Sequence, residues 1–576
     1  MTAIRSVRTA LKRSGASREV RSPLPPFSLW SSVLAGALLA AGCGDGGSGP
    51  PNETLDLSVS AAYIVQSTQN RDGTVPLVAG KPGLLRVFVV ANEANTPAPS
   101  VTVQLYSGAT PTQTLSATAT AAPTIVPTAV NQGSLANSWN YDLSGAQIQP
   151  GLRFLVTVDP QNTTDEANDD NNTFPASGTP QAVTVSAVAP LRLRFVPIHD
   201  TSSQLTGDIN ASNREGYLEL TRKIMPVLDI DADIRPPYSV RGEGFDPQGN
   251  TWQAAVAELD AVRVAEGTNR YYYGVVKTAY PGGGVVGIAS AIGGSTSLGW
   301  DRIPDHDETL AHELGHNWGR RHAPCGGAGG VDPSYPYTLG LIGVYGLDVG
   351  TREVKGPQQH TDIMGYCQAA FWISDYTYHG VFTWRLEHDQ QTTGAAVPTL
   401  LVWGRIADGE LVLEPAFEVV TRPVLPARSG PYTIEGLDDG GAILFSISFA
   451  GERLADVPGD HRQFAFAIPL DPATRDRLVT VRLRGRGREV GHTTRGRMSA
   501  ALTGPAPQAR AARRAGEAVA VEWDAVTHPA VMVRDARSGA ILSIARDGRA
   551  IVTDSGSELE LLLSDGVRTT RTRIRP

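Results

Sequence analysis

The stretch His312–His322 reads HELGHNWGRRH and decides how the centre of this chain is interpreted. His312 and His316 are four residues apart, so in a helix both side chains project from one face, one turn apart. Two imidazoles arranged in this way can reach a single zinc ion at about 2.0–2.1 Å. Glu313 then points toward the remaining coordination position, where its carboxylate can act as a general base. The stretch therefore predicts a hydrolytic zinc site.

The residues around this motif predict a buried helix. Leu310, Leu314 and Trp318 are spaced four apart and form one apolar stripe. Asp305, followed three residues later by Glu308, has the spacing of a capping box at the start of the helix. We expect the helix to present the two histidines on a face next to this buried stripe.

Gly319 and His322 extend the motif past the end of the helix. A glycine at this position can adopt a positive φ and end the helix abruptly. The chain can then turn back and supply His322 as a third nitrogen ligand. With this chain's residue frequencies, the whole pattern HExxHxxGxxH arises by chance with a probability on the order of 10⁻⁵. We predict one zinc ion bound by His312, His316 and His322, with a water as the fourth ligand; the alternative is histidines that merely pack in a core helix.

The extended pattern resembles the signature of the metzincin clan of zinc endopeptidases. Metzincins place a methionine-containing turn beneath the zinc, and the segment HTDIMGYC supplies Met364, 42 residues after His322. The resemblance implies that Met364 forms an apolar floor for the ligands. It also implies that Tyr366 stabilises the developing oxyanion, although a core methionine and a packed aromatic would look the same in sequence. The residues after His322 match no major subfamily, so the subfamily stays open.

A glycine-rich segment at residues 282–294 precedes the motif helix. In metzincins, an edge strand in this position pairs with an extended substrate. Glycines would allow a second backbone to approach closely. An ordinary glycine-rich loop with an edge strand is the alternative.

The first 43 residues are predicted to be a targeting segment. A basic region leads into an apolar run that ends in small residues and Cys43. This ending resembles a bacterial lipoprotein signal, which implies that Cys43 is lipidated and becomes the mature N-terminus. Leu39 lies four residues before the cysteine, one more than the family prefers, so an ordinary signal peptide is the alternative. In either case we expect export, and with a lipid anchor the protein would face the periplasm or the cell surface. Residues 44–54 are expected to form a flexible tether.

Two further cysteines, Cys325 and Cys367, remain if Cys43 is lipidated. An oxidising compartment favours pairing them, and two free thiols are the alternative. If bonded, they would clamp the His322 segment to the methionine turn.

The segments on either side of the motif domain are strand-like. Residues 55–189 contain short β-branched runs separated by turn residues, which is typical of a β-sandwich. Their acidic, Asn-rich hairpin at Val158–Phe174 resembles CARDB-type adhesion modules, which are immunoglobulin-like. Calcium binding is one interpretation of this hairpin and a solvated loop is the other; the acidic candidates are Asp165, Glu166, Asp169 and Asp170.

The whole chain is therefore predicted to be multidomain. An α+β metzincin-like domain at residues 190–392 would be flanked by all-β domains. On the C-terminal side we expect one β-rich domain at 393–504 and either a second one or its continuation at 505–576.

The function predicted from the sequence is that of an exported zinc endopeptidase acting on a protein or glycoprotein. Glu313 would be general base for a zinc-activated water. The net charge of −8 provides no basic surface for nucleic acid, and membrane association would come from the lipid anchor. Two alternatives stay open: a surface adhesion protein with a catalytically silent zinc site, and a hydrolase of non-peptide amides. Nothing in the sequence predicts the oligomeric state.

Overall fold

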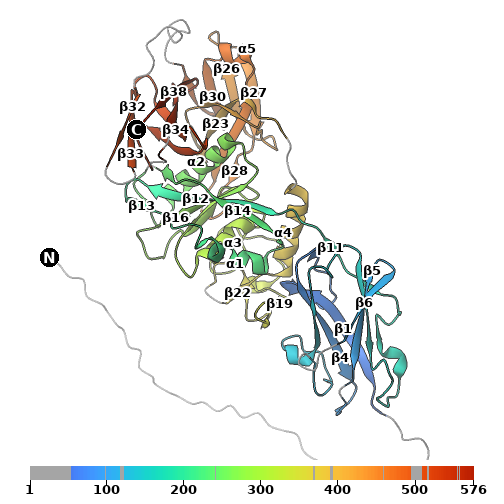
Figure 1. The fold of residues 1–576 in the computed structure, drawn as a ribbon. Coiled ribbons are helices and arrows are strands. Elements are labelled where there is room, and N and C mark those ends of the chain that lie inside the picture. The colour runs from blue at the N-terminus through green and yellow to red at the C-terminus, as the bar shows by residue number, and fades with distance from the viewer. Residues whose placement is uncertain are drawn as a thin grey trace, which may run out of the picture. The chain divides into compact units, whose positions relative to one another are not determined.

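The computed structural model describes residues 54–576, except 98, 117–121, 241, 368–369, 390–393, 458, 495–508, 515–517, 554–555 and 557. The expected signal peptide with Cys43, and the expected tether up to residue 53, lie outside the described residues. The described part is multidomain and mostly β, with several sheets and a few helices (Figure 1). None of its helices is long and apolar enough to cross a membrane.

The first described region, blue to cyan in Figure 1, is a β-sandwich. One sheet has the order β1-β4-β7 and the other β10-β8-β5-β6, with β9 on β8. Strand β8 alternates buried and half-buried residues, as expected when one face of a sheet covers a core. The two sheets enclose a common apolar core. The bounds are β1 Leu57–Val65, β2 Thr68–Gln69, β3 Leu77–Val78, β4 Gly83–Ala91, β5 Val101–Ser107, β6 Thr110–Ser116, β7 Trp139–Leu143, β8 Leu152–Val158, β9 Thr173–Phe174, β10 Gln181–Ala182 and β11 Val185–Ser186, with 3₁₀ turns η2 Leu135–Asn137 and η3 Asp169–Asn171.

The central region is built on a mixed sheet of order β13-β12-β16-β18-β17, with β14 and β15 also on β12. Its central strands β16 and β18 are almost entirely buried, because helices cover both faces. Helices α1 and α3 lie on one face and α2 on the other (Figure 1). Strand β17 is antiparallel to β18 and forms the edge. The strands are β12 Leu191–Asp200, β13 Leu205–Thr206, β14 Ile230–Ile234, β15 Tyr238–Val240, β16 Tyr271–Val276, β17 Gly287–Ala289 and β18 Thr296–Trp300, and the helices are α1 Arg214–Ile224, α2 Asn250–Glu266, α3 His306–Asn317 and α4 Asp375–His388.

Short elements between α3 and α4 connect the central region to the sandwich. Strand β19 pairs with β2 of the sandwich and with β20. The indole N–H of Trp372 also donates a hydrogen bond to the carbonyl of Ser67 at 2.8 Å. These elements are η4 Thr338–Gly340, β19 Tyr345–Asp348, β20 Glu353–Lys355, β21 Thr361–Asp362 and β22 Phe371–Trp372.

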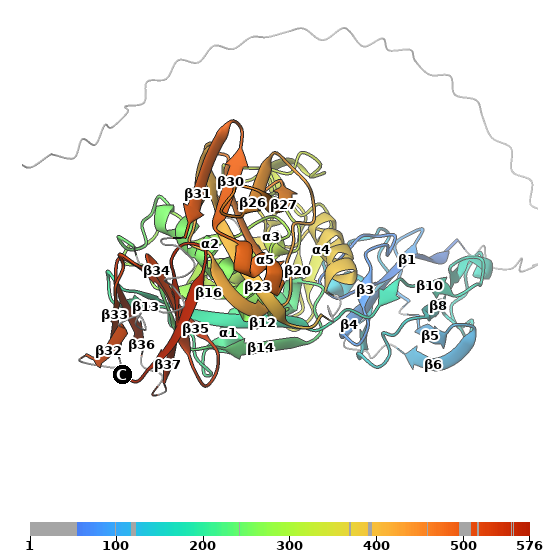
Figure 2. The ribbon, with the colours of Figure 1, turned by 90° about the horizontal axis from the view of Figure 1, so that it is seen from above.

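The C-terminal strands form two groups, orange and red in Figure 2. The orange group has sheets β24-β23-β29-β28, with β25 on β23, and β27-β26-β30-β31. The red group has sheets β32-β33-β36 and β35-β34-β37-β38. Each group has its own core. The bounds are β23 Val397–Ala407, β24 Glu410–Leu413, β25 Phe417–Thr421, β26 Tyr432–Leu437, β27 Ile443–Phe449, β28 Glu452–Arg453, β29 His461–Pro469, α5 Pro472–Arg477, β30 Thr480–Gly485, β31 Arg488–Thr493, β32 Ala509–Arg513, β33 Ala518–Trp523, β34 Ala530–Asp535, β35 Ile541–Arg546, β36 Arg549–Thr553, β37 Leu559–Ser564 and β38 Thr569–Ile574.

Helix α2 joins the central region to both C-terminal groups. Trp252 and Leu259 of this helix belong to the same apolar core as Trp403 of β23 and Ile541 of β35. The C-terminal strands are thus packed against the sheet that carries the motif helix. This packing allows a residue from the C-terminal strands to reach the candidate site.

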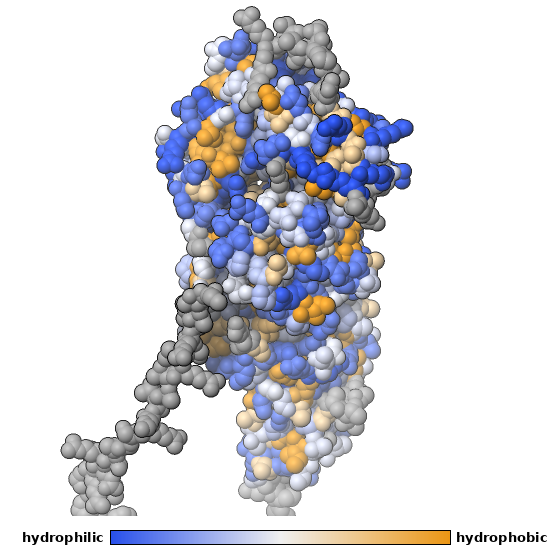
Figure 3. All heavy atoms as spheres, turned by 90° about the vertical axis from the view of Figure 1, so that its left-hand side faces the viewer, coloured by the Kyte–Doolittle hydropathy of each residue, from blue (hydrophilic) through white to orange (hydrophobic). Residues whose placement is uncertain are grey.

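Figure 3 shows one face of the molecule, coloured by hydropathy. Among the described residues on this face, apolar side chains form separate groups rather than one continuous area. Scattered groups of this kind are normal on protein surfaces and do not mark a binding site by themselves.

Candidate metal centre

Helix α3 carries the first two histidines of the motif, and its residues from Thr309 to Asn317 are all buried. Leu310, Leu314 and Trp318 pack in the core beneath the central sheet, as their spacing predicts. Asp305 is the N-cap residue of the helix, as predicted, but its side chain makes no hydrogen bond to the helix, so the predicted capping box does not form. The backbone carbonyl of Asp305 instead accepts a hydrogen bond from the Thr309 amide at 3.0 Å.

The helix ends where the motif glycine lies. Gly319 has a φ of +78°, and its amide donates to the His316 carbonyl at 3.0 Å. A Cβ at this position would lie 2.8 Å from Cε3 of Trp384. The turn therefore needs glycine for both its backbone conformation and its packing, and it brings His322 back toward α3.

The three imidazoles converge on one point. Nε2 of His316 lies 3.1 Å from Nε2 of His312 and 3.1 Å from Nε2 of His322. Tetrahedral zinc with bonds of about 2.0–2.1 Å places its ligand atoms about 3.3 Å apart. The nitrogen spacing therefore fits coordination of one ion.

Backbone carbonyls hold each ring in the orientation that a metal requires. His312 Nδ1 contacts the Ile363 carbonyl at 2.8 Å, and His316 Nδ1 contacts the Arg320 carbonyl at 2.7 Å. His322 Nδ1 contacts the carbonyl of Gly329. A carbonyl can only accept, so each Nδ1 carries the proton and each Nε2 lone pair faces the centre. This is the usual second contact of a metal-binding histidine.

A fourth side chain, which the sequence analysis missed, completes the cluster. Asp456 lies between β28 and β29, 134 residues after His322. Its Oδ1 is 2.9 Å from Nε2 of His322, 3.2 Å from that of His316 and 3.7 Å from that of His312. All four ligand atoms lie within 4.8 Å of one another. The segment GERLADVPGD around Asp456 contains no histidine and no recognisable ligand spacing, so nothing local in the sequence marks this residue.

The electrostatics of the cluster suit metal binding. Burial lowers the pKa of His316 to about 4, despite the opposing effect of Asp456. Burial disfavours the charged form of His322, but its contact with Asp456 outweighs this effect and raises the pKa. Burial would raise the pKa of Asp456, yet the three histidines hold it well below the usual value. A neutral His316 and an ionised Asp456 are the forms in which these side chains bind metals.

Glu313 lies beside the cluster, next to the carboxylate of Asp456. Its side chain is buried, with the residue 2% exposed, and Oε2 has no hydrogen-bond partner among the described residues. Burial raises the pKa of Glu313 well above its usual value, and the neighbouring Asp456 carboxylate raises it further. A Cβ on Gly287 of β17 would lie 2.3 Å from Oε1 of Glu313, so the edge strand approaches this carboxylate closely only because the residue is glycine.

The methionine turn lies directly against the motif helix. Met364 is fully buried, and a Cβ on Gly315 would lie 2.3 Å from its sulfur. The Ala323 amide donates to the Met364 carbonyl at 2.9 Å, which ties the turn to the residue after His322. Gly315 makes this contact possible because it has no Cβ, which the motif spacing alone does not reveal.

Tyr366 and the two cysteines lie on the same side of the cluster. The Tyr366 ring centroid is 4.7 Å from that of His322, and its hydroxyl donates to Oδ1 of Asp456 at 2.8 Å. Cys325 and Cys367 form a disulfide with a Cα–Cα distance of 5.3 Å. The Tyr366 amide donates to the Cys325 carbonyl at 3.2 Å. The His322 segment and the methionine turn are therefore linked by covalent and hydrogen bonds.

The four acidic residues considered for calcium do not form such a group. Among the described residues, only the three histidines and Asp456 bring three or more potential ligands together. Glu166 is buried, and its carboxylate accepts hydrogen bonds from the Leu57 amide at 2.9 Å and from Asn172 at 2.6 Å. Asp165, Asp169 and Asp170 are exposed. The acidic hairpin is thus held by hydrogen bonds of Glu166.

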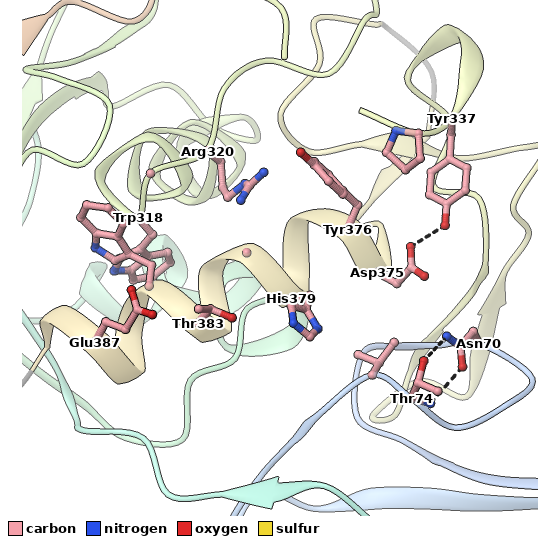
Figure 4. Close-up of a pocket in the computed structure, with 15 residues that line it drawn as sticks. Asn70, Thr74, Trp318, Arg320, Tyr337, Asp375, Tyr376, His379, Thr383 and Glu387 are labelled. Carbon is pink, nitrogen blue, oxygen red and sulfur yellow. Dashed lines mark hydrogen bonds between the residues drawn. The ribbon is translucent and has the colours of Figure 1, made fainter. Parts of the chain in front are cut away.

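A cavity of about 850 Å³ borders the cluster and runs along the edge strand. Residues 283–287, Trp300 and Glu308 line it, together with Glu313 and Asp456. A second cavity of about 570 Å³ is lined by none of the four cluster residues. Figure 4 shows it between Asn70 and Thr74 of the sandwich and side chains of α4. Of these two cavities, the first borders the candidate metal centre.

Comparisons with known proteins add little to this geometry. No protein-family model matches the sequence, and no curated protein matches it. The CARDB domain of a Pyrococcus furiosus protein, whose structure was determined in complex with di-metal ions, is 20% identical and covers 23% of this chain and 96% of that chain, with a TM-score of 0.15. A β-glucuronidase from Parabacteroides merdae is 10% identical and covers 90% of this chain and 78% of that chain, also with a TM-score of 0.15. Likenesses this weak carry no argument, so function is argued from the chain's own residues.

Proposed function

We propose that this chain is a zinc-dependent endopeptidase whose metzincin-like catalytic domain spans about residues 190–392. The observation that carries the proposal is Glu313, a buried carboxylate whose Oε2 has no hydrogen-bond partner among the described residues, beside three imidazoles spaced to bind one ion. A site that only stabilises the fold has no use for such a carboxylate, whereas hydrolysis needs a base there. Export, a lipid anchor at Cys43 and a protein or glycoprotein substrate belong to the same proposal.

The roles of the residues follow from their positions. A zinc ion held by the three histidines would polarise the scissile carbonyl and activate water for attack. Glu313 accepts a proton from the water as the new C–O bond forms. It then delivers a proton to the amide nitrogen as the C–N bond breaks. The Tyr366 hydroxyl donates a hydrogen bond to the carbonyl oxygen as negative charge develops.

Strand β17 provides the place for an extended substrate. As the edge strand of the sheet it pairs, within the described part of the chain, with β18 alone, and its outer backbone groups can pair with another chain. The cavity of about 850 Å³ is lined by the residues that lead into this strand. A peptide bound along β17 would pass Glu313, because Gly287 adjoins that carboxylate.

The test compares Glu313→Gln with the native residue on casein, with metal content measured in parallel. Because Asp456 occupies the fourth coordination position, native Glu313 and Glu313→Gln are each tested with Asp456 present and with Asp456→Asn. We expect Glu313→Gln to keep its metal and to lose activity by about 10²-fold or more. Glu410→Gln, at an exposed position, is the matched control. Hydrolysis that is independent of Glu313 in both backgrounds, or no hydrolysis in either, would overturn the proposal.

A structural metal site in an adhesion protein is the second candidate. It is favoured by Asp456, which brings the number of protein ligands to four, the number typical of structural zinc. This candidate predicts that no variant hydrolyses casein and that removing Asp456 weakens metal binding. The same set of proteins therefore separates the two candidates.

A further inference from the structure

We infer that Asp456 is a removable ligand that blocks the catalytic centre. With Asp456 in this position the chain is a latent form of the proposed hydrolase. We call residues 451–457, which carry Asp456, the plug segment. The inference rests on the proposed function and assigns its regulation to a segment of the C-terminal strands. Asp456 belongs to the cluster of four potential ligands, and the inference gives it the further role of blocking the site.

The carboxylate of Asp456 has the contacts that a reaction product would have. Oδ1 faces the three imidazole nitrogens and accepts a hydrogen bond from the Tyr366 hydroxyl at 2.8 Å. Oδ2 accepts one from the Ala289 amide of β17 at 3.3 Å. Hydrolysis of a peptide creates a new carboxylate at this place, next to the metal ligands, the oxyanion donor and the edge strand. Asp456 therefore occupies the position of the reacting group.

This occupancy excludes a substrate. The Asp456 side chain is 4% exposed, and its oxygen lies 2.9 Å from the nearest imidazole nitrogen. No space is left there for both a water and a scissile carbonyl. The adjoining cavity is lined by Asp456 of the plug segment as well as by Trp300 and Glu308.

The attachment of the plug segment allows it to move without unfolding the sheet. Its strand β28 has only two residues, both exposed, and pairs only with β29 at the edge of the sheet. Strand β29 is held independently by nine residue pairs with β23. Leu454 and Val457 are buried in the core that contains α2 and hold the segment in place. Opening therefore requires the release of two apolar side chains, a two-residue strand and the hydrogen bonds that the Leu454 amide and the Asp456 carboxylate make to the His461 carbonyl and the Ala289 amide.

Glu313 supports displacement rather than a permanent fourth ligand. Two carboxylates, those of Glu313 and Asp456, are buried side by side, and Oε2 of Glu313 has no hydrogen-bond partner among the described residues. In a permanently closed site the buried Oε2 atom would stay without a hydrogen bond, which is costly. Once Asp456 leaves, the same carboxylate faces the position where water must be deprotonated.

The test measures access to the fourth coordination position with acetohydroxamate, a small chelating ligand. Cobalt(II) is loaded into the native chain, Asp456→Asn and Asp460→Asn, and its visible spectrum is followed during titration. We expect Asp456→Asn to bind acetohydroxamate at least tenfold more tightly than the native chain, with a change in the cobalt bands. Asp460→Asn, which removes a carboxylate close by in the chain that pairs with Arg462, should behave like the native chain.

Leu454→Ser is a second variant that loosens the plug segment and keeps the ligand. We expect it to bind acetohydroxamate more tightly than the native chain, so the inference stays testable if Asp456→Asn does not fold. Equal binding by the native chain and both variants, or loss of cobalt from Asp456→Asn without hydroxamate binding, would overturn the inference. Opened variants that bind hydroxamate but do not cleave casein would leave the inference standing and remove the proposed peptidase function.

Discussion

Gly319 determines whether His322 can reach the other two histidines. Its φ of +78° lies in the left-handed region, which is costly for any residue with a Cβ. The indole of Trp384 from α4 also closes the space where a Cβ would be. A single backbone position thus couples the end of α3 to the third ligand.

We predict that Gly319→Ala destabilises the protein and weakens metal binding. The strained backbone costs about 1–3 kcal/mol, and the contact with Trp384 displaces the turn that carries His322. The measurements are urea unfolding and metal affinity by competition with a chelator. Gly409→Ala is the control, because Gly409 has a φ of +83° and open space around its Cβ position. It should lose stability but keep its metal affinity; an equal effect of both variants on metal affinity would contradict the prediction.

The methionine turn and the loop after α3 act as one element in the structure. The Ala323 amide bonds to the Met364 carbonyl at 2.9 Å, and the Cys325–Cys367 disulfide joins the same two segments over a sequence separation of 42. The loop itself contains little regular structure, so these links restrict its motion. His322 is positioned by this pair of segments rather than by a helix.

We predict that replacing Cys325 and Cys367 together with serine lowers both stability and metal retention. Loss of a cross-link that closes a loop of this length costs about 2–4 kcal/mol, and the freed loop no longer holds His322 in place. Unfolding midpoints and metal content after dialysis provide the measurement. A thiol reductant should change the native chain and leave the double variant unaffected. Unchanged values in the double variant would show that the disulfide does not position the ligand.

At the scale of the whole molecule, buried polar groups connect the central region to the C-terminal strands. The Tyr238 hydroxyl donates to the carboxylate of Glu258 in α2 and accepts a hydrogen bond from the Ile544 amide of β35 at 3.1 Å. Arg235 and Glu266 form a buried ion pair at 3.0 Å nearby. Leu454 and Val457 of the plug segment are buried in the same apolar core as Tyr238 and Ile544.

The pKa of Glu258 makes this interface sensitive to pH. Burial raises that pKa from 4.5 to about 7. Between pH 4.5 and about pH 7 the folded chain keeps a proton on Glu258 that the unfolded chain releases. The stability that this group contributes therefore falls as pH rises, and it is lowest above about pH 7. We predict that the stability of Glu258→Gln relative to the native chain increases between pH 4.5 and pH 8, by up to about 3 kcal/mol. Urea unfolding at the two pH values measures this; the same difference at both would contradict it.

Much of the architecture was predictable because it depends on local patterns. The multidomain, mostly β organisation is confirmed, since alternating apolar residues separated by turn residues specify strands without long-range information. The buried stripe of α3 follows from the spacing of Leu310, Leu314 and Trp318. Asp305 is the N-cap residue as predicted, but the capping hydrogen bond is absent, because spacing alone does not show whether the Asp305 side chain faces the helix amides.

The sequence by itself determined the candidate ligands His312, His316 and His322 and the candidate base Glu313. These residues are close together in the chain, and a helix followed by one turn suffices to bring them together. Only the tertiary structure decided the fourth member of the cluster. Asp456 lies between β28 and β29, far along the chain, and is placed there by the core that α2 shares with β23 and β29. Such a contact depends on the packing of whole domains. A single aspartate has no periodicity or spacing by which the sequence could identify it as part of the cluster.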